Sequence, residues 1–345
     1  MNYIGVDLAW GEGTATKAAK ETGLVRIDSS GTVLDAGWAR GIDEVVEWLV
    51  AKSLAGDVIA IDAPLVVANA TGMRECEREV AQRYGQWQVY ANPSNLGRPW
   101  FGGVTLRQRL EQLGFVYTDG RTPPLPDKVQ FFECYPYTTL VGAPELGYEV
   151  ERPRYKRFNP ALPNPAARRD FRAAECDELL RRMLRLTAVS PALDLRSHPV
   201  TAALIDDESP LNDVAYKHRE DLLDAALCAW TAALWAQSGL ERCQILGELD
   251  APDPEGRIPV IIAPARPEQR LGGKVARPKR PKVGLLQQVE PHSAQVSRAT
   301  TATALLTVAA SILALDHVED PDSAAFESAR EAVLAAIAGL RAGQY

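Results

Sequence analysis

The hydrophobic pattern near the start of the chain predicts an α/β fold. Short apolar runs over residues 2–8, 23–28 and 33–39 are separated by Gly-containing links and predict three consecutive strands. Residues 42–51 repeat apolar side chains at helical spacing and lead into a further apolar run that ends at Asp62. Because short links favour an antiparallel meander and helical crossovers are right-handed, we expect the strand before Asp62 to lie parallel to the first.

The rest of this region alternates helices with one further strand. Two segments, residues 65–128 and 137–219, interrupt the pattern and predict insertions. Apolar spacing predicts these additional elements: a helix over 73–84, a strand over 129–136, a helix over 166–186 and a helix over 217–235. Together the elements predict a mixed five-stranded sheet flanked by helices.

Two of the predicted strands end in a carboxylate. Asp7 follows Ile4-Gly5-Val6, and Asp62 follows the apolar run over residues 58–61. Ligands of open α/β sheets bind beyond the carboxyl ends of parallel strands, so acids on neighbouring strands converge there. Mg²⁺ and Mn²⁺ prefer oxygen ligands. We therefore expect Asp7 and Asp62 to form a metal site; the alternative is that each is a turn residue.

The helix predicted over residues 217–235 adds two aspartates. Asp221 and Asp224 are three residues apart, so their side chains lie on nearly the same face and can point to one place. They either complete the metal site or cap the start of the helix, where aspartate complements the macrodipole.

Composition narrows the cellular setting. The net charge of −7 argues against a protein that coats duplex DNA without specificity, since such a protein needs a basic face. The five cysteines form no Cys-x-x-Cys pair, so we expect reduced thiols and no zinc site. The first residues lack the basic and apolar segments of a secretory signal, which predicts a cytoplasmic protein.

The C-terminal part of the chain differs in composition from the rest. We expect one domain over residues 1–265, a basic Pro/Gly-rich linker over 266–285 and a helical hairpin over 286–345. Residues 297–317 are apolar but too short and too rich in threonine for a membrane span. The hairpin must bury its apolar faces against the domain or against a second subunit, and the second alternative would make the protein a homo-oligomer.

Several short phrases in this order resemble a known family. The phrases are Gly5-Val6-Asp7, Ile61-Asp62-Ala63-Pro64, Arg74-Glu75-Cys76-Glu77, Glu133-x-Tyr135-Pro136, Asp221-Leu222-Leu223-Asp224-Ala225-Ala226 and Asp253-Pro254-Glu255-Gly256-Arg257-Ile258. Together they resemble an uncharacterised family of predicted nucleases, catalogued as domain of unknown function 429 and assigned a ribonuclease H-like fold. The resemblance covers roughly residues 1–265. The paired aspartates also resemble those on the last helix of Holliday-junction resolvases, which share the fold.

The resemblance implies a hydrolase that cleaves nucleic-acid phosphodiester bonds with Mg²⁺ or Mn²⁺. Asp7, Asp62 and either Asp221 or Asp224 would be the metal ligands and catalytic residues, with Glu133 as a weaker fourth ligand. In such a two-metal site one ion activates water, and the other stabilises the leaving oxygen.

Two other functions are compatible with the same fold. Residues 11–14, Gly-Glu-Gly-Thr, resemble the phosphate-binding hairpin of actin-like kinases, which suggests an ATP-dependent phosphotransferase. The second Asp-Gly-Gly-Thr-like loop of those kinases is missing from the sequence. The third possibility is a non-catalytic scaffold that binds nucleic acid.

The insertions contain candidate contacts for nucleic acid. The aromatic stretch over residues 87–101 forms either a platform for unpaired bases or a self-packed loop. Residues 152–158 interleave basic and aromatic side chains, and the arginines of the helix over 166–186 line a groove or form a solvated face. His218 is either a proton shuttle or a solvated loop residue.

Overall fold

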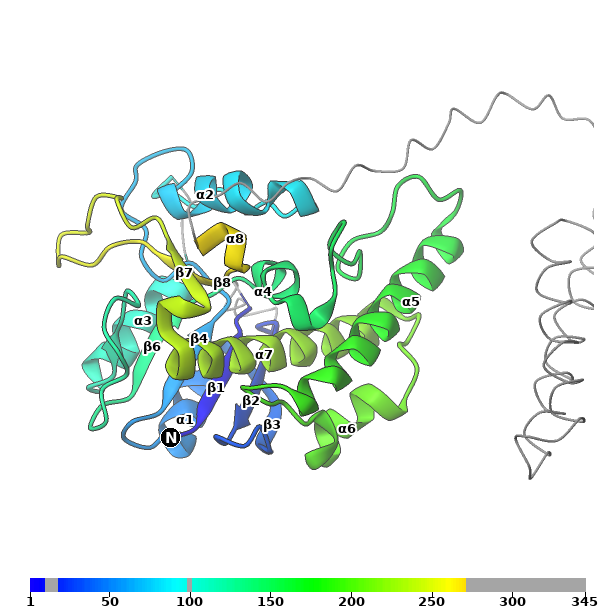
Figure 1. Cartoon of the computed structure of the whole chain (residues 1–345), viewed down its shortest axis with the longest axis horizontal. Coiled ribbons are helices and arrows are strands. Elements are labelled where there is room, and N and C mark those ends of the chain that lie inside the picture. The colour runs from blue at the N-terminus through cyan, green and yellow to red at the C-terminus, as the bar shows by residue number, and fades with distance from the viewer. Residues whose placement is uncertain (10–17, 98–100, 271–345) are drawn as a thin grey trace, which may run out of the picture. The chain divides into compact units, whose positions relative to one another are not determined.

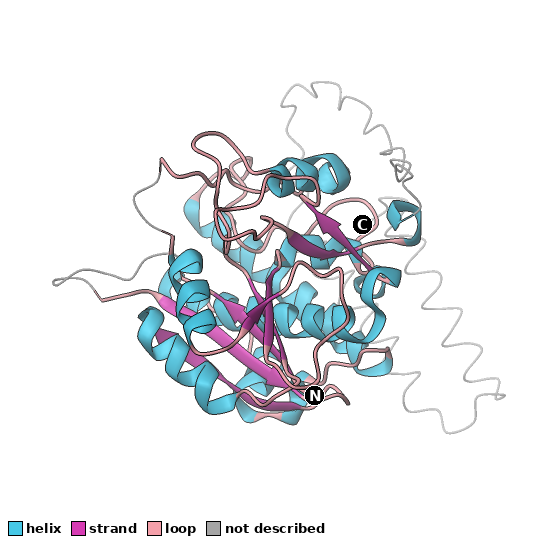
Figure 2. Cartoon of the chain, turned by 90° about the vertical axis from the view of Figure 1, so that its left-hand side faces the viewer, coloured by secondary structure: helices cyan, strands magenta, loops and turns pink. Residues whose placement is uncertain are grey.

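The computed structural model describes residues 1–9, 18–97 and 101–270 as a mixed α/β domain (Figure 1). Helices cover both faces of its main sheet, and a second, two-stranded sheet lies beside it (Figure 2). The strands of the main sheet, in spatial order, are β3 (Val33–Arg40), β2 (Glu21–Ile27), β1 (Tyr3–Asp7), β4 (Val58–Ile61), β6 (Gln130–Glu133) and β5 (Val116–Tyr117).

The strand directions confirm the predicted meander and crossover. Strands β1, β2 and β3 pair antiparallel, and β4 pairs parallel to β1. Strand β6 pairs parallel to both β4 and β5. The prediction of five strands is wrong, because the two-residue strand β5 lies inside the predicted insertion and is too short to produce an alternating pattern.

Two separate hydrophobic cores cover the two faces of the sheet. Alternate residues of each strand point to opposite faces, so Ile4 and Val6 of β1 belong to one core and Tyr3 to the other. Helices α1 (Gly41–Lys52) and α3 (Gly102–Gln112) contribute to the core with Ile4. The opposite face is covered mainly by α7 (Asp213–Ser238), which contacts β1, β2 and β4.

The remaining elements surround α7 and the ends of the strands. Helix α7 runs across the sheet in Figure 1, and α6 contacts it. These elements are α2 (Glu75–Tyr84), α4 (Pro136–Gly142), α5 (Pro165–Met183), α6 (Pro199–Asp206), β7 (Cys243–Leu246), β8 (Ile261–Pro264) and α8 (Pro267–Arg270). Strands β7 and β8 form the two-stranded antiparallel sheet, and α2 and α4 pack against it.

Two glycines let α7 approach the sheet at backbone distance. A Cβ atom added to Gly5 of β1 would lie 1.9 Å from the Ala225 carbonyl oxygen. A Cβ atom added to Gly23 of β2 would lie 2.1 Å from the Asp221 carbonyl oxygen. Any side chain at either position therefore forces α7 away from the strands.

The domain continues beyond residue 265. Arg266 is buried, and its guanidinium donates to the carbonyl oxygens of Val141 and Tyr148 and pairs with Glu149. Most of the predicted linker and the whole predicted hairpin lie outside the described residues. Within the described part of the chain, no helix has the length and apolar character needed to cross a membrane.

The contact between α7 and β1 predicts the effect of Gly5→Ala. We expect it to lower the free energy of unfolding by about 3 kcal/mol or more, because backbone atoms of α7 must shift. Gly37→Ala is the matched control, since a Cβ atom at Gly37 of β3 meets nothing within 4 Å. Urea denaturation of both variants measures the difference, and equal stabilities would contradict the packing argument.

Candidate active site: a carboxylate cluster with two lysines

The carboxyl ends of β1 and β4 open onto a cleft of about 680 Å³. Asp7 is the last residue of β1, and Asp62 follows β4 directly. The Asp62 backbone N–H donates to the Val6 carbonyl at 2.8 Å, which aligns the two strand ends. Both side chains line the cleft together with Asp221. The sequence therefore predicted correctly that these acids lie at one place, at the position where α/β sheets bind ligands.

Helix α7 brings Asp221 and Asp224 to the same place. The helix begins at Asp213, and the Asn212 side chain caps it by accepting from Val214 N at 2.9 Å and Ala215 N at 3.1 Å. Asp221 and Asp224 lie in the interior of the helix, so the capping interpretation is wrong for both. Asp224 has no exposed surface and lies beneath the cleft rather than lining it.

Lys156 connects Asp224 with Asp62. Its Nζ lies 2.6 Å from Asp224 Oδ2 and 3.8 Å from Asp62 Oδ2. The Tyr155 hydroxyl donates to the other carboxylate oxygen of Asp224 at 2.6 Å. Asp224 Oδ2 accepts no well-oriented hydrogen bond, so we regard the close ion pair with Lys156 as the interaction that compensates its burial.

Lys217 pairs with two other acids of the cleft, Asp221 and Glu220. Its Nζ lies 2.6 Å from Asp221 Oδ1 and 2.9 Å from Glu220 Oε1. Asp7 lies close enough to Asp221 for repulsion between the two carboxylates to raise the pKa of Asp221. Asp224 and Asp221 therefore each pair with a different lysine.

Burial and mutual repulsion raise the pKa values of these carboxyl groups. Burial, then repulsion from Asp7, raises the pKa of Asp221 to about 9 even though Lys217 opposes the shift. Burial also raises the pKa of Asp224 to about 7, against the attraction of Lys156. The pKa of Asp62 is raised well above its ordinary value by burial, with further repulsion from Asp7 and Asp224. Burial opposes protonation of Lys156, but Asp224 and Asp62 raise its pKa well above the usual range.

The carboxylate oxygens of the cluster are suitable ligands for a hard divalent cation, but in the structure they form ion pairs with lysines. The cluster contains four carboxyl groups that repel one another. Mg²⁺ and Mn²⁺ prefer oxygen ligands of this kind. Among residues 1–9, 18–97 and 101–270, no group of three or more His, Cys, Asp or Glu side chains is arranged to hold a metal ion. The ammonium groups of Lys156 and Lys217 instead contact the carboxylates.

Glu133 is engaged elsewhere, although it ends the neighbouring strand β6. Its two carboxylate oxygens accept from the Arg74 guanidinium at 2.6 and 2.8 Å, and Oε2 also accepts from the Leu65 N–H at 2.9 Å. Arg74 is buried as well and pairs with Glu77. These contacts attach α2 and the segment after β4 to the sheet, so Glu133 has a structural role here.

Lys156 and Lys217 are the site residues that the sequence analysis missed. The spacing of Lys217 and Asp221, four residues apart on a helix, signals such an ion pair. Lys156 lies in the basic and aromatic segment over residues 152–158, which the sequence predicted as a nucleic-acid contact. Its pairing with Asp224 carried no sequence signal, because the two residues are far apart in the chain.

His218 also lines the cleft, and it lies on α7 rather than in a solvated loop. Its ring stacks on Trp38 with centroids 3.6 Å apart, and its Nδ1 donates to Glu21 Oε2 at 2.6 Å. Partial burial opposes ionisation of Glu21, but the hydrogen bond and charge of His218, together with Arg40, lower its pKa. The ring is therefore held in one orientation beside the carboxylate cluster.

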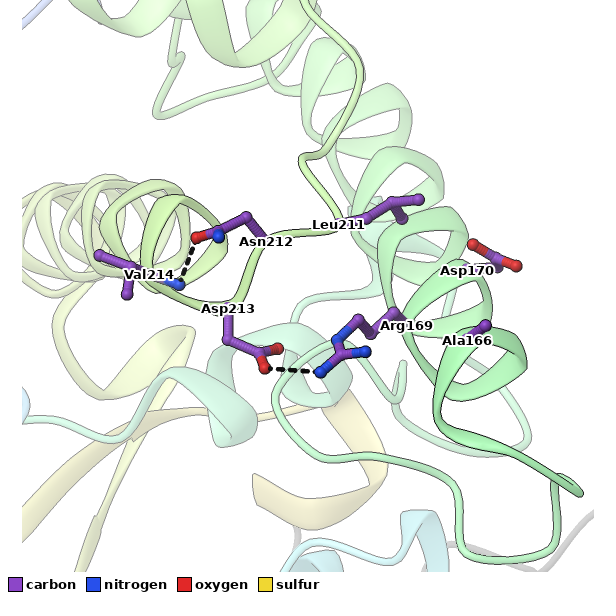
Figure 3. A pocket seen from close by; sticks show the side chains of 7 residues that line it. All are labelled: Ala166, Arg169, Asp170, Leu211, Asn212, Asp213 and Val214. Atoms are coloured by element: carbon purple, nitrogen blue, oxygen red, sulfur yellow. Dashed lines mark hydrogen bonds and ion pairs between the residues drawn. The ribbon is translucent and has the colours of Figure 1, made fainter.

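A second hollow of about 500 Å³ lies between α5 and the start of α7 (Figure 3). It shares Asp213 and Val214 with the main cleft. Arg169 and Arg172 both pair with Asp213, and Arg182 pairs with Glu178. These three arginines of α5 therefore form ion pairs with nearby acids and do not form a groove of unpaired basic side chains.

Only part of the predicted aromatic platform over residues 87–101 is exposed to solvent. Trp87 is buried and donates to the Glu149 carbonyl, whereas Tyr90 is exposed. Trp100 lies outside the described residues, as does the Gly-Glu-Gly-Thr segment over 11–14.

We compared the chain with known protein families, curated proteins and solved structures, and none of them matches it.

The raised pKa of Asp221 predicts how stability depends on pH. Between its ordinary value of 3.8 and about 9, the folded protein keeps a proton that the unfolded chain has lost. Stability of the metal-free protein therefore falls as pH rises through this window, and Asp221→Asn should reduce that fall. Melting temperatures at pH 5 and pH 9 with a chelator test this, with Asp127→Asn at an exposed position as the control. The same pH dependence in both variants would contradict the assignment.

The contacts of Glu133 predict a stability effect that differs from that of a metal ligand. Glu133→Gln leaves part of the buried Arg74 charge uncompensated, which should cost about 3 kcal/mol. Glu75→Gln, which breaks the exposed pair with Arg78, should cost less than about 1 kcal/mol. Urea denaturation measures both. A stable Glu133→Gln protein that no longer responds to Mn²⁺ would instead make Glu133 a ligand.

Proposed function

We propose that this protein is a divalent-metal-dependent nuclease with a ribonuclease H-like fold, related to the family catalogued as domain of unknown function 429. One observation carries the proposal. Asp7, Asp62 and Asp221, from two strand ends and one helix, converge on the floor of a cleft. Turn residues or helix caps have no reason to gather in this way, because bringing buried acids together costs free energy.

The strand order supports the proposed fold. An antiparallel meander of three strands, followed by parallel strands on the other side of β1, is the arrangement expected of ribonuclease H-like proteins. The aspartate-bearing helix α7 lies across β1, β2 and β4, as the last helix of that fold does. The insertions add α2 and α3 after β4, and α5 and α6 before α7.

Asp7, Asp62 and Asp221 are the residues that would hold Mg²⁺ or Mn²⁺, with Asp224 behind them. When bound, the metal would lower the pKa of an attacking water and neutralise charge that develops on the phosphate. The chain's own residues have three other roles. Glu133 and Arg74 fix the segment after β4, Tyr155 orients Asp224, and the Glu21 carboxylate orients His218.

The rim of the cleft suits a polyanionic substrate. Lys20, Arg40 and Arg157 are exposed and line the same cleft as the carboxylates. Basic side chains at this position can contact the phosphates on either side of the bond that is cleaved. Because the whole chain is acidic, these contacts must be local, which favours a substrate bound over a short length.

A non-catalytic nucleic-acid-binding scaffold is the second candidate. One observation favours it: Lys156 and Lys217 pair with Asp224 and Asp221, so the described site compensates part of its charge without metal. A scaffold predicts binding without cleavage, so the two functions differ in a direct assay.

Asp7→Asn and Asp62→Asn test the nuclease proposal. Each removes a charged ligand with almost no change of shape, and each should reduce Mn²⁺- or Mg²⁺-dependent cleavage to background. The assay uses labelled single-stranded, duplex and branched DNA and RNA with the full chain. Asp127→Asn is the control and should keep full activity. Full activity in either cleft variant rules out the site, and binding without cleavage by the wild type favours the scaffold.

A further inference from the structure

We infer that Lys156 takes the place of a second divalent cation, so that this site binds one metal ion per chain and not two. The inference rests on the proposed metal-dependent function and specifies the composition of the site. It replaces the two-metal arrangement expected from the family resemblance.

The position of Lys156 is the first argument. Its Nζ contacts Asp224 at 2.6 Å and lies 3.8 Å from Asp62, so one ammonium group connects the end of β4 with α7. Asp224 is fully buried and does not line the cleft, whereas Lys156 does. An ion that enters the cleft therefore meets Lys156 before it can reach the Asp224 carboxylate.

The surroundings of Lys156 hold it in this position. The Nζ atom lies 5.2 Å from the centroid of the Tyr137 ring and 5.9 Å from that of Tyr155, within the range of cation–π contacts. Tyr155 itself is anchored, because its hydroxyl donates to Asp224 and its carbonyl accepts from the Tyr216 hydroxyl at 2.5 Å. Only 18% of the Lys156 side chain is exposed. These contacts and its burial therefore hold the Lys156 side chain in one position.

Lys217 differs from Lys156 in how firmly its side chain is held. Its side chain is 53% exposed, so it can turn toward solvent and release Asp221. Asp7 and Asp221 then share no fixed cation, and both side chains line the cleft. Asp7, Asp221 and the cleft-facing side of Asp62 are therefore the place for the single metal ion.

The charges lead to the same number of ions. The four aspartates and Glu220 carry five negative charges when ionised, and Lys156 and Lys217 carry two positive charges, which leaves three negative charges. One divalent ion then leaves one negative charge, whereas two divalent ions leave one positive charge. In hydrolysis the water oxygen bonds to phosphorus, the bond to the leaving oxygen breaks, and a proton passes from the water to the leaving oxygen. An ammonium group beside the reacting phosphate supplies positive charge throughout these steps without giving up its own proton.

The number of bound Mn²⁺ ions tests the inference independently of activity. Equilibrium dialysis of the full-length wild-type chain against Mn²⁺ should give one ion per chain. Lys156→Met removes the charge and should give two, because Asp224 becomes accessible to a second ion. Lys128→Met is the matched control, since Lys128 is exposed and precedes β6 at the opposite end of the sheet, and it should give one ion.

Other results would contradict either the role of Lys156 or the nuclease proposal, and the two cases can be distinguished. Two ions in the wild type, or one ion in folded Lys156→Met, would overturn the role of Lys156 and leave the nuclease proposal standing if cleavage still needs metal. No binding and no cleavage in the wild type or in Lys156→Met would overturn the nuclease proposal itself. If Lys156→Met does not fold, the wild-type stoichiometry decides alone.

Discussion

The contact between the backbone of α7 and strands β1 and β2 is the constraint on which the rest of the structure depends. It requires glycine at positions 5 and 23, because a Cβ atom there would lie 1.9 Å and 2.1 Å, respectively, from carbonyl oxygens of α7, well inside van der Waals contact. Because α7 lies this close, side chains in its interior reach the ends of β1 and β4. The carboxylate cluster is therefore a direct consequence of how closely a helix packs on a sheet.

The same packing creates an electrostatic problem that the structure solves in two ways. Acids that are buried together repel one another and become harder to ionise. Lysines from two different parts of the chain compensate some of this charge, one firmly held and one largely exposed. Protonation compensates a further part, because burial and repulsion from Asp7 raise the pKa of the Asp221 carboxyl group. The proposed function follows from this balance, because a cation that binds only the folded site would stabilise the folded protein.

Much of the fold was predictable because its strands and helices have strong periodic patterns. The meander, the crossover to β4 and the helical character of α7 follow from apolar spacing alone. The predicted start of α7 was too late, because the helix begins at Asp213 and only Tyr216 is buried in its first four residues, so no apolar period marks this turn. That error made Asp221 and Asp224 resemble caps. Strand β5 was missed because two residues carry no period.

The sequence by itself determined which acids follow the buried strands and lie on one helical face, and so where a site had to be. Only the tertiary structure decided their partners. Glu133 is the last residue of β6 and lies beside Ile61, one position before Asp62, and Arg74 neutralises it outside the cluster. Lys156 is distant from Asp224 in sequence but contacts it in the fold. The physical reason is that periodicity reports which face a residue occupies, whereas the charge state of a buried acid depends on whichever groups long-range packing places beside it.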